Sequence, residues 1–280
     1  MSATLPRFPD RKPDLPLRSP LTLPLLVLTL AAFVHARAHA GEEITTDRPD
    51  VVESADIVPN VQIEAGLQQS LDKRDGLQAR ALTTPTLLRI GVSRSLELRL
   101  ESDGYINATV TGAADGSRVH DQGLSDAALG VKWRTQGGDE AGRPSVAWLA
   151  DVEMPSGSAA FRGSGWRPSL RLVSEWELPN EFSLGIMPGI ALDRTADGHE
   201  FATGLFAATL GNGFAPGWDA FVEIAAQQIA AKRYGGDIVT FDTGVSRRLT
   251  ADLEFDAALF VGLTHETPAL SWGVGGAYRF

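Results

Sequence analysis

The 280-residue chain contains no cysteine, which excludes a disulfide scaffold, thiolate metal sites, cysteine nucleophiles and a lipid-anchored lipoprotein. Basic residues are in the minority, 25 Lys and Arg against 35 Asp and Glu, so the formal charge is −10. This balance argues against a nucleic-acid partner, which requires a basic footprint. After residue 41 no stretch holds eighteen consecutive apolar residues, so the sequence predicts no transmembrane helix.

The first forty residues have the layout of a secretory signal peptide. Four basic residues precede residue 20, a fourteen-residue apolar run covers 21–34, and Ala38-His39-Ala40 forms a small-x-small cleavage pattern. An uncleaved N-terminal anchor is the alternative, although the run is short for a membrane span. We therefore expect three parts: a signal peptide over 1–40, an N-terminal segment over 41–60, and a β-barrel over 61–280.

The chain after residue 60 alternates between apolar and polar residues with a period of two, which is typical of β-strands. In residues 96–101 every second residue is Leu and every other one is charged. About twelve such segments can be counted, and they are separated by alternating short and long connections. The segments expected as strands cover 61–71, 80–91, 96–105, 124–133, 145–154, 168–178, 182–192, 201–211, 219–229, 238–247, 253–263 and 270–280.

This pattern fits an all-β, antiparallel transmembrane β-barrel of about 12 strands, of the outer-membrane type. A soluble sandwich alternates too, but aromatic residues gather here at the segment ends, as expected where a barrel crosses two membrane interfaces. The chain also ends on an alternating strand with Phe280, similar to the C-terminal signal recognised by the outer-membrane barrel assembly machinery. We expect that machinery and outer-membrane lipid as partners, and the outer membrane of a Gram-negative bacterium as the location.

The segment that precedes the first strand carries a family resemblance. It reads Thr-Thr-Asp-Arg-Pro-Asp over 45–50, then Glu53-Ser54, Val58-Pro59 and Gln62-Ile-Glu64. This resembles the opening of the MetA-pathway of phenol degradation family, and 86–99 and the Tyr-Arg-Phe ending resemble other parts of it. Asn60 stands where the family usually has Gly. The resemblance implies an outer-membrane transporter with a link to the uptake of aromatic compounds.

Candidate catalytic chemistry is sparse. His120, His199 and His265 all fall in expected loops, and no pair has metal-ligand spacing, so we expect no metal and no cofactor. An outer-membrane hydrolase would need His and Ser side by side on the barrel rim, and no nucleophile elbow supports one. The sequence therefore predicts a protein that is not an enzyme.

The charged faces of the expected strands supply the candidate lumen residues. They form either a salt-bridge network that packs a narrow barrel or a polar conduit, and their acidic excess favours cations or neutral solutes over anions. The lumen-lining candidates are Glu64, Arg89, Glu97, Arg99, Glu101, Asp126, Asp151, Glu153, Arg171, Glu175, Glu223, Asp242 and Asp256.

The N-terminal segment has two possible roles. Its charged residues Asp47, Arg48, Asp50 and Glu53 can fold into the lumen as a plug, which pairing with Arg89, Arg99 or Arg171 would favour, or the segment can remain a solvated periplasmic tail.

For the whole chain we expect a channel for the passive passage of small solutes, with hydrophobic or aromatic compounds among the candidates. The alternatives are a non-transporting structural or adhesive barrel, with loops 103–123 and 155–167 as the contact surface, and the rim hydrolase.

Overall fold

The computed structural model describes residues 43–280 except 75, 113–115, 140–141 and 196, so the predicted signal peptide lies outside the described residues. Within the described part of the chain the regular structure is β-sheet, apart from one short 3₁₀ turn, η1 (Lys232–Tyr234). No helix among these residues is long and apolar enough to cross a bilayer.

The sheet is built from fifteen strand segments that follow the chain in order. They are β1 (Val61–Arg74), β2 (Leu77–Thr83), β3 (Thr86–Ser93), β4 (Leu96–Ser102), β5 (Tyr105–Gly112), β6 (Arg118–Leu124), β7 (Ala127–Gln136), β8 (Ser145–Met154), β9 (Arg167–Leu178), β10 (Phe182–Arg194), β11 (Glu200–Ala215), β12 (Trp218–Ile229), β13 (Ile238–Thr250), β14 (Leu253–Gly262) and β15 (Leu270–Arg279).

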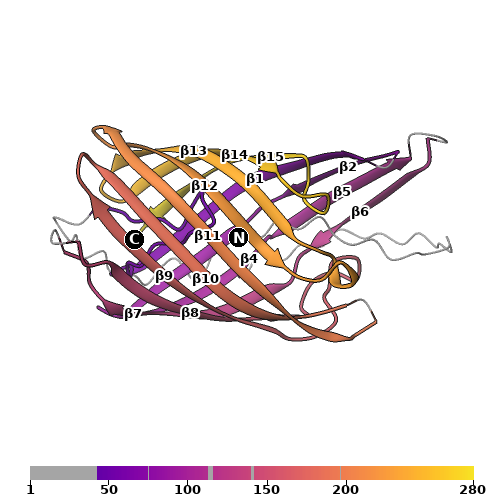
Figure 1. Ribbon diagram of the computed structural model, residues 1–280, viewed down its shortest axis with the longest axis horizontal. Helices are drawn as coiled ribbons and strands as arrows, with labels where there is room; N and C mark the ends of the chain where they lie inside the picture. The colour runs from indigo at the N-terminus through magenta and orange to yellow at the C-terminus, as the bar shows by residue number, and fades with distance from the viewer. Residues whose placement is uncertain (1–42, 75, 113–115, 140–141, 196) are drawn as a thin grey trace.

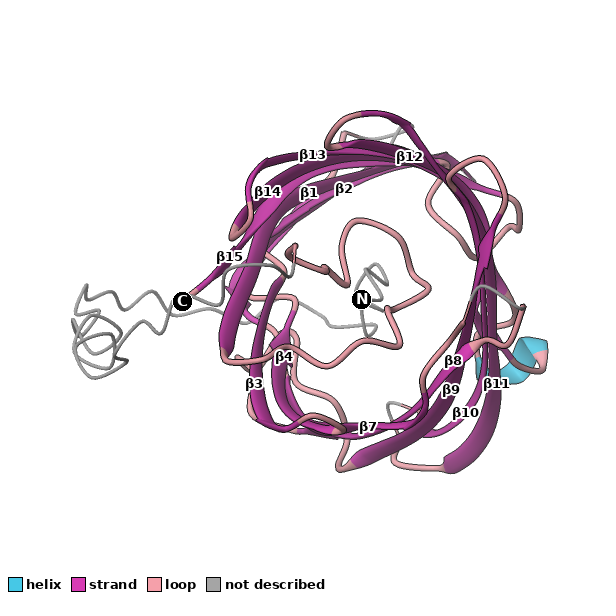
Figure 2. Ribbon diagram, turned by 90° about the vertical axis from the view of Figure 1, so that its left-hand side faces the viewer, coloured by secondary structure: helices cyan, strands magenta, loops and turns pink. Residues whose placement is uncertain are grey.

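The fifteen segments occupy twelve positions around the wall. β1 pairs with β3 along its first half and with β2 along its second half, so β2 and β3 are two parts of one interrupted strand. β4 and β5 form the next interrupted strand, and β6 and β7 the third, because β3 pairs with β4, β2 with β5, β4 with β7 and β5 with β6. β15 pairs with β1 over ten residues, which closes the barrel (Figures 1 and 2). The predicted twelve-stranded antiparallel barrel is confirmed.

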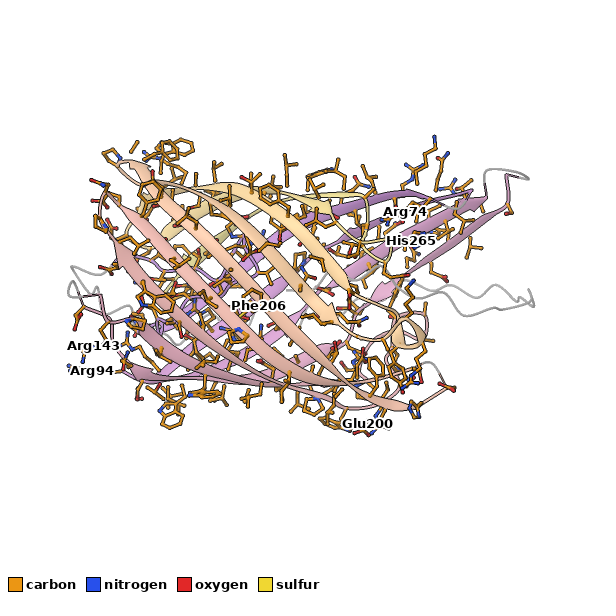
Figure 3. All side chains as sticks on the ribbon, in the orientation of Figure 1. Arg74, Arg94, Arg143, Glu200, Phe206 and His265 are labelled. Carbon is orange, nitrogen blue, oxygen red and sulfur yellow. The ribbon has the colours of Figure 1, made fainter. Side chains whose placement is uncertain are left out.

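The side chains of the barrel wall face outward or inward as the predicted alternation requires. On β14, Phe255, Leu259 and Val261 are exposed to the outside, whereas Glu254 and Asp256 are buried in the interior. The same holds around the barrel, and exposed apolar side chains form a belt on the outer surface (Figure 3). In a bilayer such a belt faces lipid, and the closed sheet pairs all of its backbone groups internally.

The prediction fails in one region, residues 103–123, which we expected to be a long loop. The structure forms β5 and β6 there, and with β2 they extend the sheet beyond the rest of the barrel (Figure 1). The alternation of this extension is inverted. Its inward face carries the buried apolar residues Ala81, Ile106 and Ala108, which pack against Phe161 of the loop 155–166. Its outward face carries Gln78, Arg80, Arg118 and His120, with the exposed apolar residues Leu82 and Tyr105 nearer the barrel. A strand that lies in water on its outer side has no reason to place apolar residues there, so the rule used for the membrane wall missed it.

Candidate functional site in the barrel lumen

Residues 43–60 run through the barrel interior and form no strand (Figure 2). Four of their apolar side chains, Ile44, Val52, Ala55 and Val58, are at most 4% exposed. A buried backbone without a sheet partner needs other acceptors and donors for its N–H and C=O groups. The charged side chains of the wall supply them.

Four glutamates of the wall accept hydrogen bonds from backbone N–H groups at four positions of the segment. The carboxylate of Glu223 on β12 accepts the N–H groups of Val51 and Val52, both at 2.8 Å. The other three contacts are of the same kind: Glu64 accepts the N–H of Asp47 at 3.0 Å, Glu175 that of Ala55 at 2.5 Å, and Glu97 that of Val58 at 3.0 Å. These hydrogen bonds are made to backbone N–H groups of the segment and not to its side chains.

Basic wall residues donate to the carbonyl groups of the same segment. Arg89 on β3 donates to Thr45 O at 3.1 Å and to Asp56 O at 3.0 Å, and Lys132 on β7 donates to Ser54 O at 2.8 Å. Acidic wall residues therefore bind N–H groups of the segment and basic ones bind its carbonyl groups, and at the peptide group between Ser54 and Ala55 both halves are bound, by Lys132 and Glu175.

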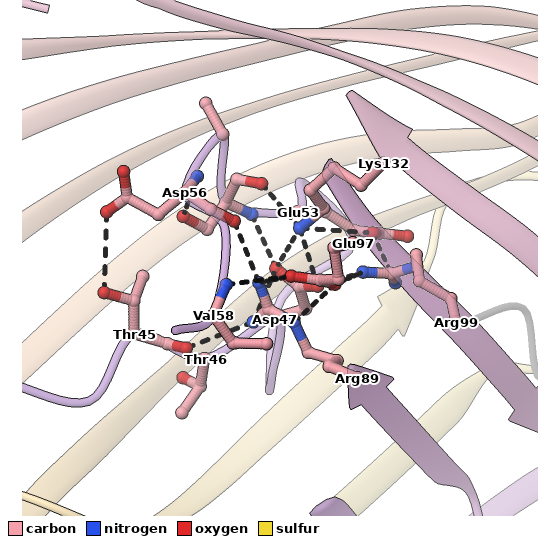
Figure 4. Close-up of polar contacts among 12 residues, drawn as sticks. Thr45, Thr46, Asp47, Glu53, Asp56, Val58, Arg89, Glu97, Arg99 and Lys132 are labelled. Atoms are coloured by element: carbon pink, nitrogen blue, oxygen red, sulfur yellow. Dashed lines mark hydrogen bonds and ion pairs between the residues drawn. The ribbon is translucent and has the colours of Figure 1, made fainter. Parts of the chain in front are cut away.

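Asp47 is the centre of the ion-pair network (Figure 4). Its carboxylate lies 2.6 Å from Nη1 of Arg99, 2.9 Å from Nζ of Lys132 and 3.4 Å from Nη1 of Arg89, and all four side chains are at most 1% exposed. Burial by itself would raise the pKa of Asp47, but the three cations outweigh it and hold the pKa well below its usual value. Asp47 is therefore ionised in the docked segment.

Glu53 occupies a second cationic clamp next to the first. Its carboxylate lies 2.6 Å from Nη2 of Arg99 and 2.5 Å from Nη1 of Arg171, which also contacts Asp151 at 2.6 Å. Burial opposes ionisation, but Arg171 and Arg99 outweigh it and lower the pKa of Glu53 to about 2. Arg99 thus joins the two acidic residues of the segment to one side of the wall.

Arg48 ties the segment to the opposite, acidic side of the lumen. Its guanidinium forms a bidentate contact with Asp256 on β14, with Nη2–Oδ1 at 2.9 Å and Nε–Oδ2 at 3.1 Å. The guanidinium fits because two glycines face it: a Cβ at Gly66 or Gly275 would lie only 2.6 or 2.5 Å from its Nη2. The glycine-rich last strand thereby makes room for this side chain.

An apolar contact completes the fit of the segment. Val52 and Ala55 pack on small buried side chains of the wall. The contact is close, since a Cβ at Gly185 would lie 2.8 Å from Cγ1 of Val52. The wall residues in this cluster are Ala147, Leu149, Val173, Met187, Ala207 and Ala225.

Asp50 differs from the other acidic residues of the segment because no basic side chain within the described part of the chain forms an ion pair with it. Burial and then the nearby Glu223 carboxylate raise its pKa well above the usual value. It lines a recess between the segment and the barrel wall. The recess is lined by residues 47–51 together with Gln68, Gln227, Ala258, Phe260 and Gly273.

The predicted lumen residues divide into two groups in the structure. Those in direct contact with the segment are Glu64, Arg89, Glu97, Arg99, Arg171, Glu175, Glu223 and Asp256. The remaining five, Glu101, Asp126, Asp151, Glu153 and Asp242, point inward but contact wall residues or loops. Asp126 serves the loop after β8: it accepts the N–H groups of Gly157 and Gly163 and pairs with Arg167.

Lys132, which the alternation also assigns to the inward face, is fully buried between Asp47 and Ser54. One contributor to this site was absent from the predicted set. Gln62, also fully buried, donates to Thr45 O at 2.9 Å and to Glu64 at 2.9 Å. An uncharged residue on a mostly charged face gave no signal of its own.

The three histidines do not come together. His120, expected in a loop, lies on β6 and contacts Thr109 Oγ1 at 3.1 Å. His199 contacts the hydroxyl of Tyr234 at 3.2 Å and stacks on its ring, and His265 lies beside Glu266. Within the described residues no group of three or more His, Asp or Glu side chains could hold a metal ion.

Solved structures of low sequence identity share this fold. An outer-membrane channel from Pseudomonas putida F1 aligns with a TM-score of 0.61 at 12% identity, covering 81% of this chain and 98% of that one. The β domain of the Bordetella autotransporter BrkA aligns with a TM-score of 0.51 at 16% identity, covering 79% and 98%. The transport unit of the autotransporter AIDA-I from Escherichia coli aligns with a TM-score of 0.50 at 12% identity, covering 80% and 91%.

No protein of curated function matches the sequence. The family model for the MetA-pathway of phenol degradation, in contrast, matches residues 46–280, which include the lumenal segment from Thr46 onward and the whole barrel. The fold and the matched range agree with the resemblance seen at residues 45–64. The chain belongs to the MetA-pathway of phenol degradation family of outer-membrane-type β-barrels.

Proposed function

We propose that this protein is an outer-membrane channel for the passive passage of small solutes, and that residues 43–60 are a removable plug. The observation that carries the proposal is the use of the wall charges. Glu64, Glu97, Glu175 and Glu223 accept hydrogen bonds from the backbone of the segment, and Glu64 and Glu97 do so in addition to their ion pairs with basic wall residues. A purely structural barrel needs no such peptide-binding interior.

The contacts of the plug are of a kind that can be exchanged for water. Apart from the apolar packing of Val52 and Ala55, they are hydrogen bonds and ion pairs, and the net contribution of each is the difference between two polar environments. The segment leads directly into β1, whose first residue lies at the end of the barrel that carries the short turns. It can therefore swing out toward the periplasm while remaining attached.

The open lumen would favour cations or neutral solutes. When the segment leaves, Asp256 loses Arg48, and Arg99, Lys132 and Arg171 lose Asp47 and Glu53. The acidic residues among the predicted lumen residues still outnumber the basic ones. An acidic constriction disfavours anions. Reversal potentials measured across a salt gradient in a planar bilayer test this, and a clear preference for anions would reject it.

The solute class follows from family membership only in outline. The family description points to aromatic compounds, and the P. putida F1 protein of the same fold is an outer-membrane channel. We propose small hydrophobic or aromatic solutes as cargo, transport without a catalytic step, and insertion by the barrel assembly machinery through the strand that ends at Phe280.

Deletion of residues 42–58 tests the plug. We expect single-channel conductance to rise several-fold in planar bilayers, since the deleted residues fill the layer between Arg99 and Asp256. Unchanged conductance would remove the plug from the account.

A pair of point variants separates the plug from general damage to the wall. Glu223→Gln weakens the contact to Val51 and Val52, and it should increase the frequency of open events. Glu101→Gln is the matched control, because Glu101 points inward but only approaches Arg99 at 4.0 Å. Equal behaviour of the two variants would contradict gating by the segment.

A further inference from the structure

The outward face of the sheet extension carries a row of basic side chains. Register places Lys73 of β1 beside Gln78 of β2, then Thr111 of β5, then Arg118 of β6. In the next row, Leu71 is followed by Arg80, Thr109 and His120 in the same way. Lys73, Arg80 and Arg118 are exposed, and none of them forms an ion pair with another described residue.

The face is basic without compensation. The acidic residues of these four strands among the described residues are Glu64, Asp72 and Asp121, and all three alternate to the inward side. Arg74 also points inward, where it pairs with Asp72 and donates to Thr264 O. On this face Lys73 and Arg80 are diagonal neighbours and Arg118 lies two strands beyond Arg80, with no outward acidic residue on the described parts of these strands.

The height of Lys73 coincides with the outer membrane interface. Ile63 pairs with Tyr278 near the end of the barrel that carries the short turns, and Lys73 lies ten residues further along β1. At about 3.3 Å per residue and a tilt of about 45°, Lys73 lies roughly 23 Å above Ile63. The apolar band of an outer-membrane barrel is about 25 Å tall, so Lys73 lies where lipid headgroups begin.

An open groove with an apolar floor adjoins the cations. It is bordered by Lys73, Arg80 and Gln78, and Leu71 and Leu270 form part of its lining. The lining also includes Asp72, whose carboxylate is paired with Arg74. Leu71 and Leu270 are direct register partners, and both are exposed on the outer surface. A ligand with a phosphate group above and an acyl chain below matches this combination of a cationic rim and an apolar floor.

We propose that this face binds a phosphorylated glycolipid of the outer leaflet, with Arg80 and Arg118 as phosphate ligands, Lys73 as a third cation, and the Leu71–Leu270 groove as the acyl-chain contact. The site is independent of the lumen. It would hold the extension against the membrane, at the interrupted strands that border the channel mouth.

The test uses the full-length protein in detergent, titrated with bisphosphorylated lipid A and followed by native mass spectrometry. We expect Arg80→Ala/Arg118→Ala to weaken binding at least tenfold. The matched control is Arg94→Ala/Arg143→Ala, which removes two exposed arginines at the opposite end of the barrel (Figure 3) and should leave the affinity unchanged. Heat-modified electrophoretic mobility verifies that each variant is a folded barrel.

Two further arms distinguish the lipid from other sources of phosphate. Dephosphorylated lipid A should bind at least tenfold more weakly than the bisphosphorylated form, and inorganic phosphate at millimolar concentration should not displace the lipid. Equal binding by both lipid forms, equal affinity of the two double variants, or displacement by inorganic phosphate would each overturn the proposal. Channel conductance plays no part in these readouts, so their failure leaves the proposed transport function untouched.

Discussion

Apolar and polar residues alternate with a period of two in both the membrane wall and the sheet extension, but the apolar side chains face outward in the wall and inward in the extension. On β14 the apolar residues Phe255 and Leu259 face outward and Asp256 faces inward. On β2 and β5 the buried residues Ala81 and Ala108 face inward, whereas Arg80 faces outward. The medium outside each strand determines which side chains face outward: lipid favours apolar side chains, and water or lipid headgroups favour polar ones. Alternation alone therefore indicates a strand, and the polarity of its outward side chains indicates whether the strand lies inside or outside the membrane.

The lumen contrasts with both outer surfaces because its charges are buried, and the largest predicted effect concerns these charges. Arg99→Leu leaves Asp47, Glu53 and Glu97 short of a cation in a buried layer. Loss of one partner of a buried ion pair typically costs about 3–5 kcal/mol. We expect a decrease of that size in the free energy of unfolding, measured by urea titration in lipid vesicles.

Arg134→Leu is the control for that variant. Arg134 pairs with Asp56 at 3.0 Å, but both side chains are about one-third to one-half exposed. An exposed pair contributes about 0–1 kcal/mol, so this variant should be close to wild type. Equal losses from Arg99→Leu and Arg134→Leu would show that the lumenal layer is hydrated and that its charges are not buried.

The second prediction compares the outer surfaces of the two regions. Leu259→Arg puts a cation at the middle of the lipid-facing belt and should cost about 2–4 kcal/mol, whereas Thr111→Arg adds one to the polar face of the extension and should cost about 0–1 kcal/mol. The same urea titration measures both. A large loss from Thr111→Arg would place the extension inside the bilayer and would contradict the explanation of its inverted pattern.

The third and smallest predicted effect is a pH response of the plug. Glu53 has its pKa lowered from 4.5 to about 2 when docked, so its contribution to docking is complete above pH 4.5 and decreases as the pH falls toward 2. Asp47, with a lowered pKa, acts in the same direction, and Asp50, with a raised pKa, acts in the opposite one. We expect channel-opening events to become more frequent as the pH is lowered from 6 to 3.

Glu53→Gln should flatten that response, because the variant cannot gain a proton at this position. Recordings at matched ionic strength keep screening constant across the pH series. A wild-type channel that opens as the pH rises from 3 to 6 would reverse the predicted sign and would assign control of the plug to Asp50.

The sequence permitted prediction of the wall more than of the site. The Leu96–Glu101 alternation identified a strand and its two faces, and ten-residue segments of this kind gave the twelve positions. The strands within residues 103–123 were missed because the criterion of an apolar outer face holds only inside the membrane. The contacts between lumenal residues could not be predicted from the sequence either. Arg48 and Asp256, for example, are 208 residues apart, and only closure of the barrel brings them together. The acidic segment 47–53 suggested a plug by its charge, but the backbone contacts of Glu64 and Glu223 carry no sequence signal.

The absence of cysteine makes a direct test of the plug possible. In the structure a Cβ at Gly185 would lie 3.8 Å from Cβ of Val52, which is the usual separation across a disulfide. The double variant Val52→Cys/Gly185→Cys should be locked when oxidised, with conductance below that of wild type, and should return to wild-type conductance on reduction. Each single variant with the same oxidant is the control. If the oxidised protein forms the cross-link quantitatively and conducts as the reduced protein does, residues 43–60 do not gate the lumen and the central claim is wrong.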